Sequence, residues 1–155
     1  MFVRSLFVLS VITFAFTVHA KPSRPIDPDT QAIRAAALDY IEGWYEGSVD
    51  RMTRAVHPEL AKRIVRTENG ASRIDQMGAS ALIGGVRAGF GTKTPKAQQL
   101  KDVTILDRFE NAASVKIVAS DWIDYLHLAK VDGRWKIVNV LWELKPKPPV
   151  PPTKK

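Results

Sequence analysis

Residues 122–144 read WIDYLHLAKVDGRWKIVNVLWEL, two runs rich in aliphatic and aromatic side chains on either side of Asp132-Gly133. An Asp-Gly pair between two such runs is a strong signal for a β-hairpin, because both residues tolerate the positive φ of a tight turn. Two shorter apolar runs, residues 103–107 and 113–120, precede this stretch and are also separated by turn-forming residues. The last third of the chain is therefore predicted to be a four-stranded antiparallel meander.

Residues 31–45 show a helical pattern instead, with apolar side chains that recur at steps of three and four. These side chains would share one helical face and are Ile33, Ala36, Ala37, Tyr40, Ile41 and Trp44. Asp29 or Thr30 can cap the start of this helix, and Gly47 suits its end. Ser48 can cap a second, short helix.

The middle of the chain is less regular. We expect residues 59–65 to form a further helical turn after His57-Pro58, because proline suits the first turn of a helix. Residues 68–75 and 92–99 are polar and are expected to be loops. Residues 78–91 carry a helix-like apolar pattern, which three glycines weaken.

Helices first and a meander of strands afterwards indicate an α+β fold. The helices would pack on one face of a curved antiparallel sheet. Aromatic side chains on the opposite face would then need a partner, so we expect a homodimer.

The N-terminus has the pattern of an export signal. In residues 1–20 a single Arg4 precedes an uncharged stretch of 14 residues, and Val18-His19-Ala20 provides a cleavage site. The stretch is shorter than the about 20 apolar residues that span a bilayer. We therefore expect a periplasmic or extracellular protein without stable membrane insertion. Residues 21–29 would be an extended lead-in, residues 30–145 the folded domain and residues 146–155 a Pro/Lys-rich tail.

The charge distribution argues against a nucleic-acid partner. The chain of 155 residues has 23 Lys and Arg against 16 Asp and Glu, but the excess lies at the two ends. Residues 26–144 hold equal numbers of both signs. A phosphate-binding face needs basic side chains concentrated on one surface of the domain. The absence of cysteine excludes disulfides, thiolate nucleophiles and cysteine metal sites.

Two blocks of sequence resemble a known family. Residues 40–47 (YIEGWYEG) leading to 55–60 (AVHPEL) form the first block, and residues 122–128 (WIDYLHL), 131–139 (VDGRWKIVN) and Trp142 form the second. In this order they resemble the branch of the nuclear transport factor 2-like superfamily described as putative lumazine-binding. That superfamily also contains ketosteroid isomerases and polyketide-cyclase-like proteins.

The resemblance covers residues 30–146 and implies a cone-shaped fold. In this fold a strongly bent antiparallel sheet wraps a long N-terminal helix and encloses a pocket at the wide end. It also implies that dimers through the outer sheet face are common. Function does not follow from it, because such a fold carries enzymes, binding proteins and scaffolds alike.

The isomerase relatives hold an oxyanion with a helix-borne tyrosine and a protonated aspartate, and use a second carboxylate as base. The resemblance places Tyr40 at the tyrosine position and Asp124 near the aspartate position. The base would fall near residues 62–64 (KRI), which offer no carboxylate. Tyr40 and Asp124 can therefore bind a polar atom of a ligand without catalysis. A core tyrosine and an ion-paired carboxylate are the alternative interpretations.

The other candidates for the pocket are His57, His127, Trp44 and Trp142. His57 precedes a proline and can instead shape a turn. The alternation along the strand does not decide whether His127 faces the pocket. The tryptophans can stack on a flat ligand or fill the core and a dimer interface. Two histidines without an HExxH pattern or cysteine do not indicate a metal, and no motif indicates a cofactor.

Three hypotheses follow from these patterns. The first is an exported, non-catalytic domain that binds a small flat or apolar ligand in the cone, or serves as a dimeric interaction module. The second is an isomerase-, cyclase- or dehydratase-like enzyme with Tyr40 and Asp124 as hydrogen-bond donors and His57 or His127 as base. The third is a structural partner protein whose core is filled. An enzyme requires these side chains to converge on one point of a cavity.

Overall fold

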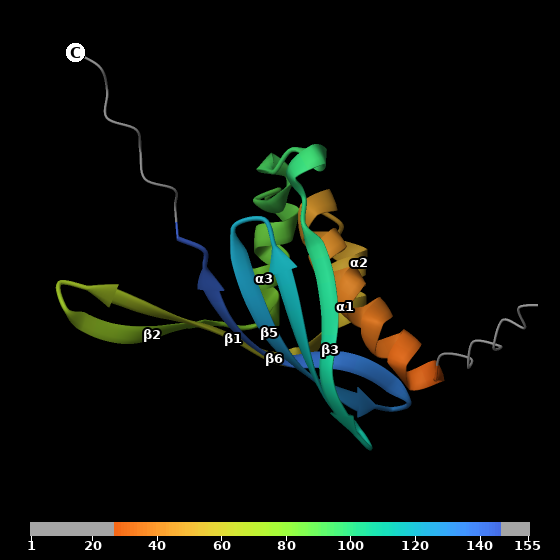
Figure 1. Cartoon of the computed structure of the whole chain (residues 1–155). Helices are drawn as coiled ribbons and strands as arrows, with labels where there is room; N and C mark the ends of the chain where they lie inside the picture. The colour runs from red at the N-terminus through yellow and green to blue at the C-terminus, as the bar shows by residue number, and fades with distance from the viewer. Residues whose placement is uncertain (1–26, 147–155) are drawn as a thin grey trace, which may run out of the picture.

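A curved sheet of six strands carries the helices on one of its faces (Figure 1). The computed structural model describes residues 27–146, so the expected signal peptide, most of the lead-in and the Pro/Lys-rich tail lie outside the described residues. The elements in chain order are α1 (Pro28–Glu46), α2 (Val49–Ala55), β1 (Val56–Glu68), β2 (Ala71–Met77), α3 (Ala79–Arg87), the short 3-10 helices η1 (Gly91–Lys93) and η2 (Lys96–Gln98), β3 (Lys101–Phe109), β4 (Ala112–Ala119), β5 (Trp122–Val131) and β6 (Arg134–Leu144). The α+β class expected from the sequence is confirmed.

The sheet is mixed rather than purely antiparallel, which corrects one part of the expectation. Its strand order is β2-β1-β6-β5-β4-β3. The meander from β3 to β6 is antiparallel throughout, and Asp132 and Gly133 turn its last hairpin with φ values of 48° and 73°. β1, however, pairs parallel to β6 and antiparallel to β2. A strand from the middle of the chain thus extends the meander and places its side chains beside those of β5 and β6.

The middle of the chain is where the sequence-based expectation was wrong. Residues 59–65 belong to strand β1 instead of a helix, and residues 68–75 span the β1–β2 hairpin instead of a loop. Leu60, Lys62 and Ile64 are buried on alternate positions of β1, the two-residue period of a strand. Asn69 and Gly70 turn the hairpin with positive φ values, the same turn chemistry as Asp132-Gly133. This hairpin projects away from the helices in Figure 1.

Helix α1 begins at Pro28, three residues before the helical pattern expected from residue 31. Asp27 caps it, because its side chain accepts a hydrogen bond from the backbone N–H of Thr30 at 3.0 Å, and Pro28 occupies the first turn. Asp29 is not a cap: its carboxylate accepts from Lys130 at 2.7 Å and from Trp135 at 3.0 Å. These bonds lower the pKa of Asp29 and tie the start of α1 to the β5–β6 hairpin. The predicted cap Ser48 and helix end Gly47 are confirmed.

Within residues 27–146, none of the helices combines the length and hydropathy that crossing a bilayer requires.

Gly91 and Gly84 give a matched test of this packing. A Cβ atom at Gly91 would overlap the backbone carbonyl of Trp44, near the end of α1, whereas a Cβ atom at Gly84 in α3 would meet nothing within 4 Å. We expect Gly91→Ala to lower the free energy of unfolding by about 1–3 kcal/mol, because the α1 backbone must move. Gly84→Ala should raise it by about 0.5–1 kcal/mol through helix propensity. Urea unfolding measures both, and equal effects of the two variants would contradict this packing.

Candidate functional site

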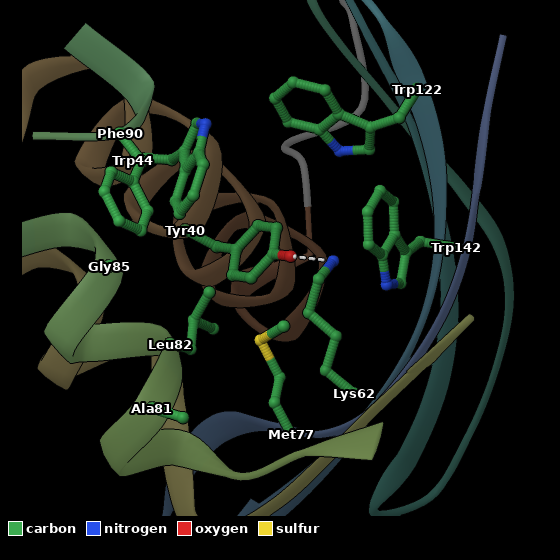
Figure 2. Close-up of a pocket in the computed structure, with 10 residues that line it drawn as sticks. All are labelled: Tyr40, Trp44, Lys62, Met77, Ala81, Leu82, Gly85, Phe90, Trp122 and Trp142. Atoms are coloured by element: carbon green, nitrogen blue, oxygen red, sulfur yellow. Dashed lines mark hydrogen bonds between the residues drawn. The ribbon is translucent and has the colours of Figure 1, made fainter. Parts of the chain in front are cut away.

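An apolar cavity of about 190 Å³ lies between helices α1 and α3 and the strands β1, β5 and β6. Three tryptophans and a phenylalanine form much of its wall: Trp44, Phe90, Trp122 and Trp142. Leu82 of α3 and Met77 at the end of β2 close its lower side in Figure 2. Tyr40 and Lys62 are the two polar side chains in the lining, so the cavity is a largely apolar space with one polar point.

The polar point is a hydrogen-bonded cluster around the ammonium group of Lys62. Lys62 Nζ donates to Asp124 Oδ1 at 2.6 Å and to the Tyr40 hydroxyl at 2.8 Å, the contact drawn in Figure 2. Trp122 Nε1 donates to the other carboxylate oxygen of Asp124 at 2.6 Å. The Tyr40 hydroxyl reaches Asp124 Oδ1 only at 3.4 Å. Because this hydrogen bond is long, the Tyr40 hydroxyl is the donor of the cluster that is most readily available to a ligand.

Burial controls the charges of this cluster. Asp124 is fully buried and Lys62 is 7% exposed, so the two charges need each other. Burial lowers the pKa of Lys62, while the ion pair with Asp124 opposes that change. Burial and the neighbouring Asp124 carboxylate raise the pKa of Tyr40 well above its usual value. Tyr40 therefore remains a phenol and keeps a proton to donate.

Three elements bring this cluster together. Tyr40 lies on the buried face of α1, and Lys62 takes an inward position of β1 between Leu60 and Ile64. Asp124 takes an inward position of β5, directly across from Trp142 of β6. The ring of Trp142 also faces the Lys62 ammonium, with 4.7 Å between Nζ and the ring centroid. This is within the range of a cation–π contact.

The structure unites four of the six side chains that the sequence suggested. Tyr40, Trp44 and Trp142 line the cavity, and Asp124 lies directly behind its polar point. The interpretation of Asp124 as an ion-paired carboxylate is the one that its contact with Lys62 supports.

The two histidines are placed elsewhere. The ring of His57 accepts a hydrogen bond from the backbone N–H of Glu59 at 3.2 Å, a local contact at the start of β1. His127 is exposed and contacts Asn139, on the face of β5 opposite to Asp124. Strand alternation separates these faces. Neither histidine is therefore positioned as a base for a ligand held by Tyr40 and Asp124.

Lys62, the central residue of the site, is not among the site residues predicted from the sequence, in which residues 62–64 stand out only for the lack of a carboxylate. The signal was the alternation of Leu60, Lys62 and Ile64, which places a charged residue on the core side of a strand. Among residues 27–146, no group of three or more acidic, histidine or cysteine side chains could hold a metal ion.

Comparison with known proteins gives one family and many related folds. A family model described as "Putative lumazine-binding" matches residues 28–143. A nuclear transport factor 2-like protein of unknown function from Shewanella baltica is 19% identical, with a TM-score of 0.62 over 81% of this chain and 100% of that chain. A similar protein from Methylobacillus flagellatus is 18% identical, with a TM-score of 0.59 over 79% and 97%.

A ketosteroid isomerase-like protein from Erwinia carotovora is 10% identical, with a TM-score of 0.51 over 79% of this chain and 100% of that chain. No curated protein matches the sequence. At these identities the solved structures show the shared fold and leave the activity open.

The ion pair predicts a non-additive mutational cycle. Asp124→Asn should lower the free energy of unfolding by about 3–5 kcal/mol, because it leaves the buried Lys62 ammonium without its counter-charge. The double variant Lys62→Met/Asp124→Asn should recover most of that loss, because it removes both charges. Urea unfolding of the single and double variants measures the coupling. Additive losses would show that the two groups do not depend on each other.

Proposed function

Since the chain belongs to the family described as "Putative lumazine-binding", whose model spans residues 28–143, we propose that its cavity binds a small, flat ligand without transforming it. The ring of the ligand would lie among the tryptophans, and an oxygen or ring-nitrogen acceptor would meet Lys62 and Tyr40. The observation that carries this proposal is the single polar point in an otherwise apolar, aromatic cavity.

The size of the cavity supports a compact ligand. Pockets for drug-sized molecules measure about 300–1,000 Å³, and this one measures about 190 Å³. One ring or two fused rings suit that space better than a steroid skeleton. Tryptophan and phenylalanine walls favour a flat aromatic system through stacked and edge-on contacts.

The charge of the polar point supports a neutral acceptor. The positive charge of Lys62 is offset by Asp124, so the cluster carries no net charge. A carbonyl oxygen can accept from the Tyr40 hydroxyl, whose bond to Asp124 is long, and approach the Lys62 ammonium. The pteridine-2,4-dione ring of lumazine, to which the family description refers, presents such oxygens as two amide-type carbonyl groups.

The indole N–H of Trp142 adds to this argument. It is buried and has no hydrogen-bond partner among the described residues. An unpaired buried donor costs about 1–3 kcal/mol. A ligand acceptor that reached it would remove that cost.

The arrangement does not favour proton-transfer catalysis. Aspartate, glutamate and histidine are absent from the described cavity lining. The one carboxylate behind it, Asp124, is fully buried and already accepts from Lys62 and Trp122. Abstraction of a proton next to a carbonyl needs a base within hydrogen-bond reach of that proton. We therefore place the isomerase- or cyclase-like alternative second.

We also propose that the protein is exported and acts as a homodimer. The charge and hydropathy pattern of residues 1–20 supports export. Tyr125 and Leu141 support a dimer, because they lie across from each other on the outer face of β5 and β6 with 46% and 49% of their surface exposed. A second copy packed on this face would cover both.

Two neighbouring glycines test the ligand proposal. A Cβ atom at Gly85 would lie 3.4 Å from the ring of Phe90 and 3.6 Å from the ring of Trp44, at the cavity wall. We expect Gly85→Leu to weaken binding of lumazine at least about tenfold, a loss of about 1.4 kcal/mol, because the leucine occupies the cavity. Gly84→Leu is the matched control, because a Cβ atom at Gly84 would meet nothing within 4 Å. Calorimetric titration measures both affinities.

Equal affinities of the two leucine variants would contradict binding in this cavity. A wild-type protein that binds neither lumazine nor another fused heteroaromatic ring would contradict the proposed function itself.

The dimer has its own test. Tyr125→Ser/Leu141→Ser should shift the mass measured by light scattering from that of two chains to that of one, because it removes apolar surface from the proposed interface. Phe90→Ser is the control, since Phe90 is 58% exposed but lines the cavity on the side of the sheet that carries the helices. A wild-type protein that is monomeric at high concentration would contradict the dimer.

A further inference from the structure

Lys62 differs from every other described lysine in its surroundings. Its side chain is 8% exposed, its ammonium lies within the apolar cavity, and its contacts are a carboxylate, a phenol and an indole ring. Lys62 and Asp124 are the two buried charged residues of the described chain. The side chain that offers hydrogen bonds to a ligand in this cavity is therefore also an amine, a group that can act as a nucleophile.

A lysine becomes a nucleophile when its amine loses a proton. Burial acts in that direction on Lys62, because it lowers the pKa of the ammonium group. The 2.6 Å hydrogen bond to Asp124 Oδ1 provides a direct path for the proton. Tyr40, at 2.8 Å on another side of the same nitrogen, keeps its own proton and can pass one to an oxygen bound there. A nucleophile, a proton acceptor and a proton donor thus surround one point of the cavity.

We propose that Lys62 forms a Schiff base with flat aromatic aldehydes or ketones that enter this cavity. The proposal deepens the proposed function and rests on it, because the carbonyl compound must first occupy the ligand cavity. It names carbonyl compounds as the ligand class for which the site is built, and Lys62 as the residue that holds them covalently and reversibly.

The step balances within the site. The Lys62 ammonium gives one proton to the Asp124 carboxylate, and the free amine then bonds to the carbonyl carbon while the carbonyl π electrons move to oxygen. That oxygen takes a proton from the nitrogen through the Tyr40 hydroxyl, which gives a carbinolamine. Asp124 returns its proton through the Tyr40 hydroxyl, 3.4 Å from Oδ1, to the carbinolamine hydroxyl group, which leaves as water while the nitrogen lone pair forms the C=N bond. The products are a protonated imine, an Asp124 carboxylate and one water molecule, so charge and atoms are conserved.

Lys136 provides an internal control for the role of the cavity. Burial and the nearby charges of Arg134 and Arg54 also lower the pKa of Lys136. Its ammonium, however, donates to the backbone carbonyls of Thr53 and Arg54, and no carboxylate or phenol among the described residues is bonded to it. A reactivity set by pKa alone would label both lysines. A reactivity set by the cavity would label Lys62 alone.

The experiment uses 2-naphthaldehyde as the probe and sodium cyanoborohydride to trap the imine as a secondary amine. The mature chain should gain the mass of one aldehyde less one oxygen atom, and peptide mapping should locate the gain at Lys62. Lys62→Arg should lose the adduct, because a guanidinium cannot form it, and Lys136→Arg should keep it. Tyr40→Phe should slow its formation. Thermal unfolding of each variant confirms that it is folded.

A competitor makes the test independent of any variant. 2-Naphthalenemethanol has the same ring system and no carbonyl group, and its binding can be followed by tryptophan fluorescence. It should suppress labelling of Lys62 in the wild-type protein. Labelling spread over exposed lysines, or labelling equal at Lys62 and Lys136, would overturn the Schiff-base proposal. If the alcohol still binds in that case, the proposed ligand cavity stands. If neither compound binds, the Schiff-base proposal fails, and the lumazine titration decides the proposed ligand cavity separately.

Discussion

The buried ion pair between Lys62 and Asp124 is the interaction on which the site depends. Two charges in an apolar interior are favourable only when they meet at close range and their remaining hydrogen-bonding capacity is satisfied. Here they meet at 2.6 Å, and Tyr40 and Trp122 contact the same two groups. The pair therefore requires α1, β1 and β5 to be in place together. It also specifies register, because a shift of one residue in β1 or β5 would move a charge to the opposite face of the sheet.

The same pair explains the character of the cavity. An apolar space lined by tryptophans would accept many flat molecules, and an unpaired lysine would select anions. Here Asp124 compensates the charge of Lys62. The result is a polar point without net charge, beside a phenol whose hydrogen bond to Asp124 is long. The site then selects a ligand by the position of the hydrogen-bond acceptor on its flat ring. This is why we favour a neutral carbonyl-bearing ligand over an anionic one.

Local patterns in the sequence were sufficient for much of this structure. Asp132-Gly133, the apolar strands around it and the steps of three and four in α1 identified the meander, the long helix and the α+β class. The β1–β2 hairpin was missed although Asn69-Gly70 is the same kind of turn signal as Asp132-Gly133. Polar and charged residues surround Asn69-Gly70, because the hairpin extends beyond the helices and has little core to cover. Apolar periodicity was therefore a poor guide there.

The candidate site was also predicted only in part from the sequence. The family resemblance identified Tyr40 and Asp124, but Lys62, which donates a hydrogen bond to both, is contributed by β1. Its parallel pairing with β6 joins residues distant in sequence, and no local pattern specifies such a pairing. The sequence also left open which face of β5 points inward, so His127 and Asp124 were both candidates. Burial of Asp124, Leu126 and Leu128 decides that face.

The central claim is that a flat ligand binds with an acceptor atom at Lys62 and Tyr40. Nuclear magnetic resonance of protein with lysine side chains labelled at Cε and Nζ tests it most directly, because Lys62 should give a signal distinct from the exposed lysines. We predict that saturation with lumazine shifts the Lys62 signal and leaves the signals of Lys101, Lys116 and Lys136 unchanged. A ligand that binds while the Lys62 signal stays in place would show that it does not meet Lys62.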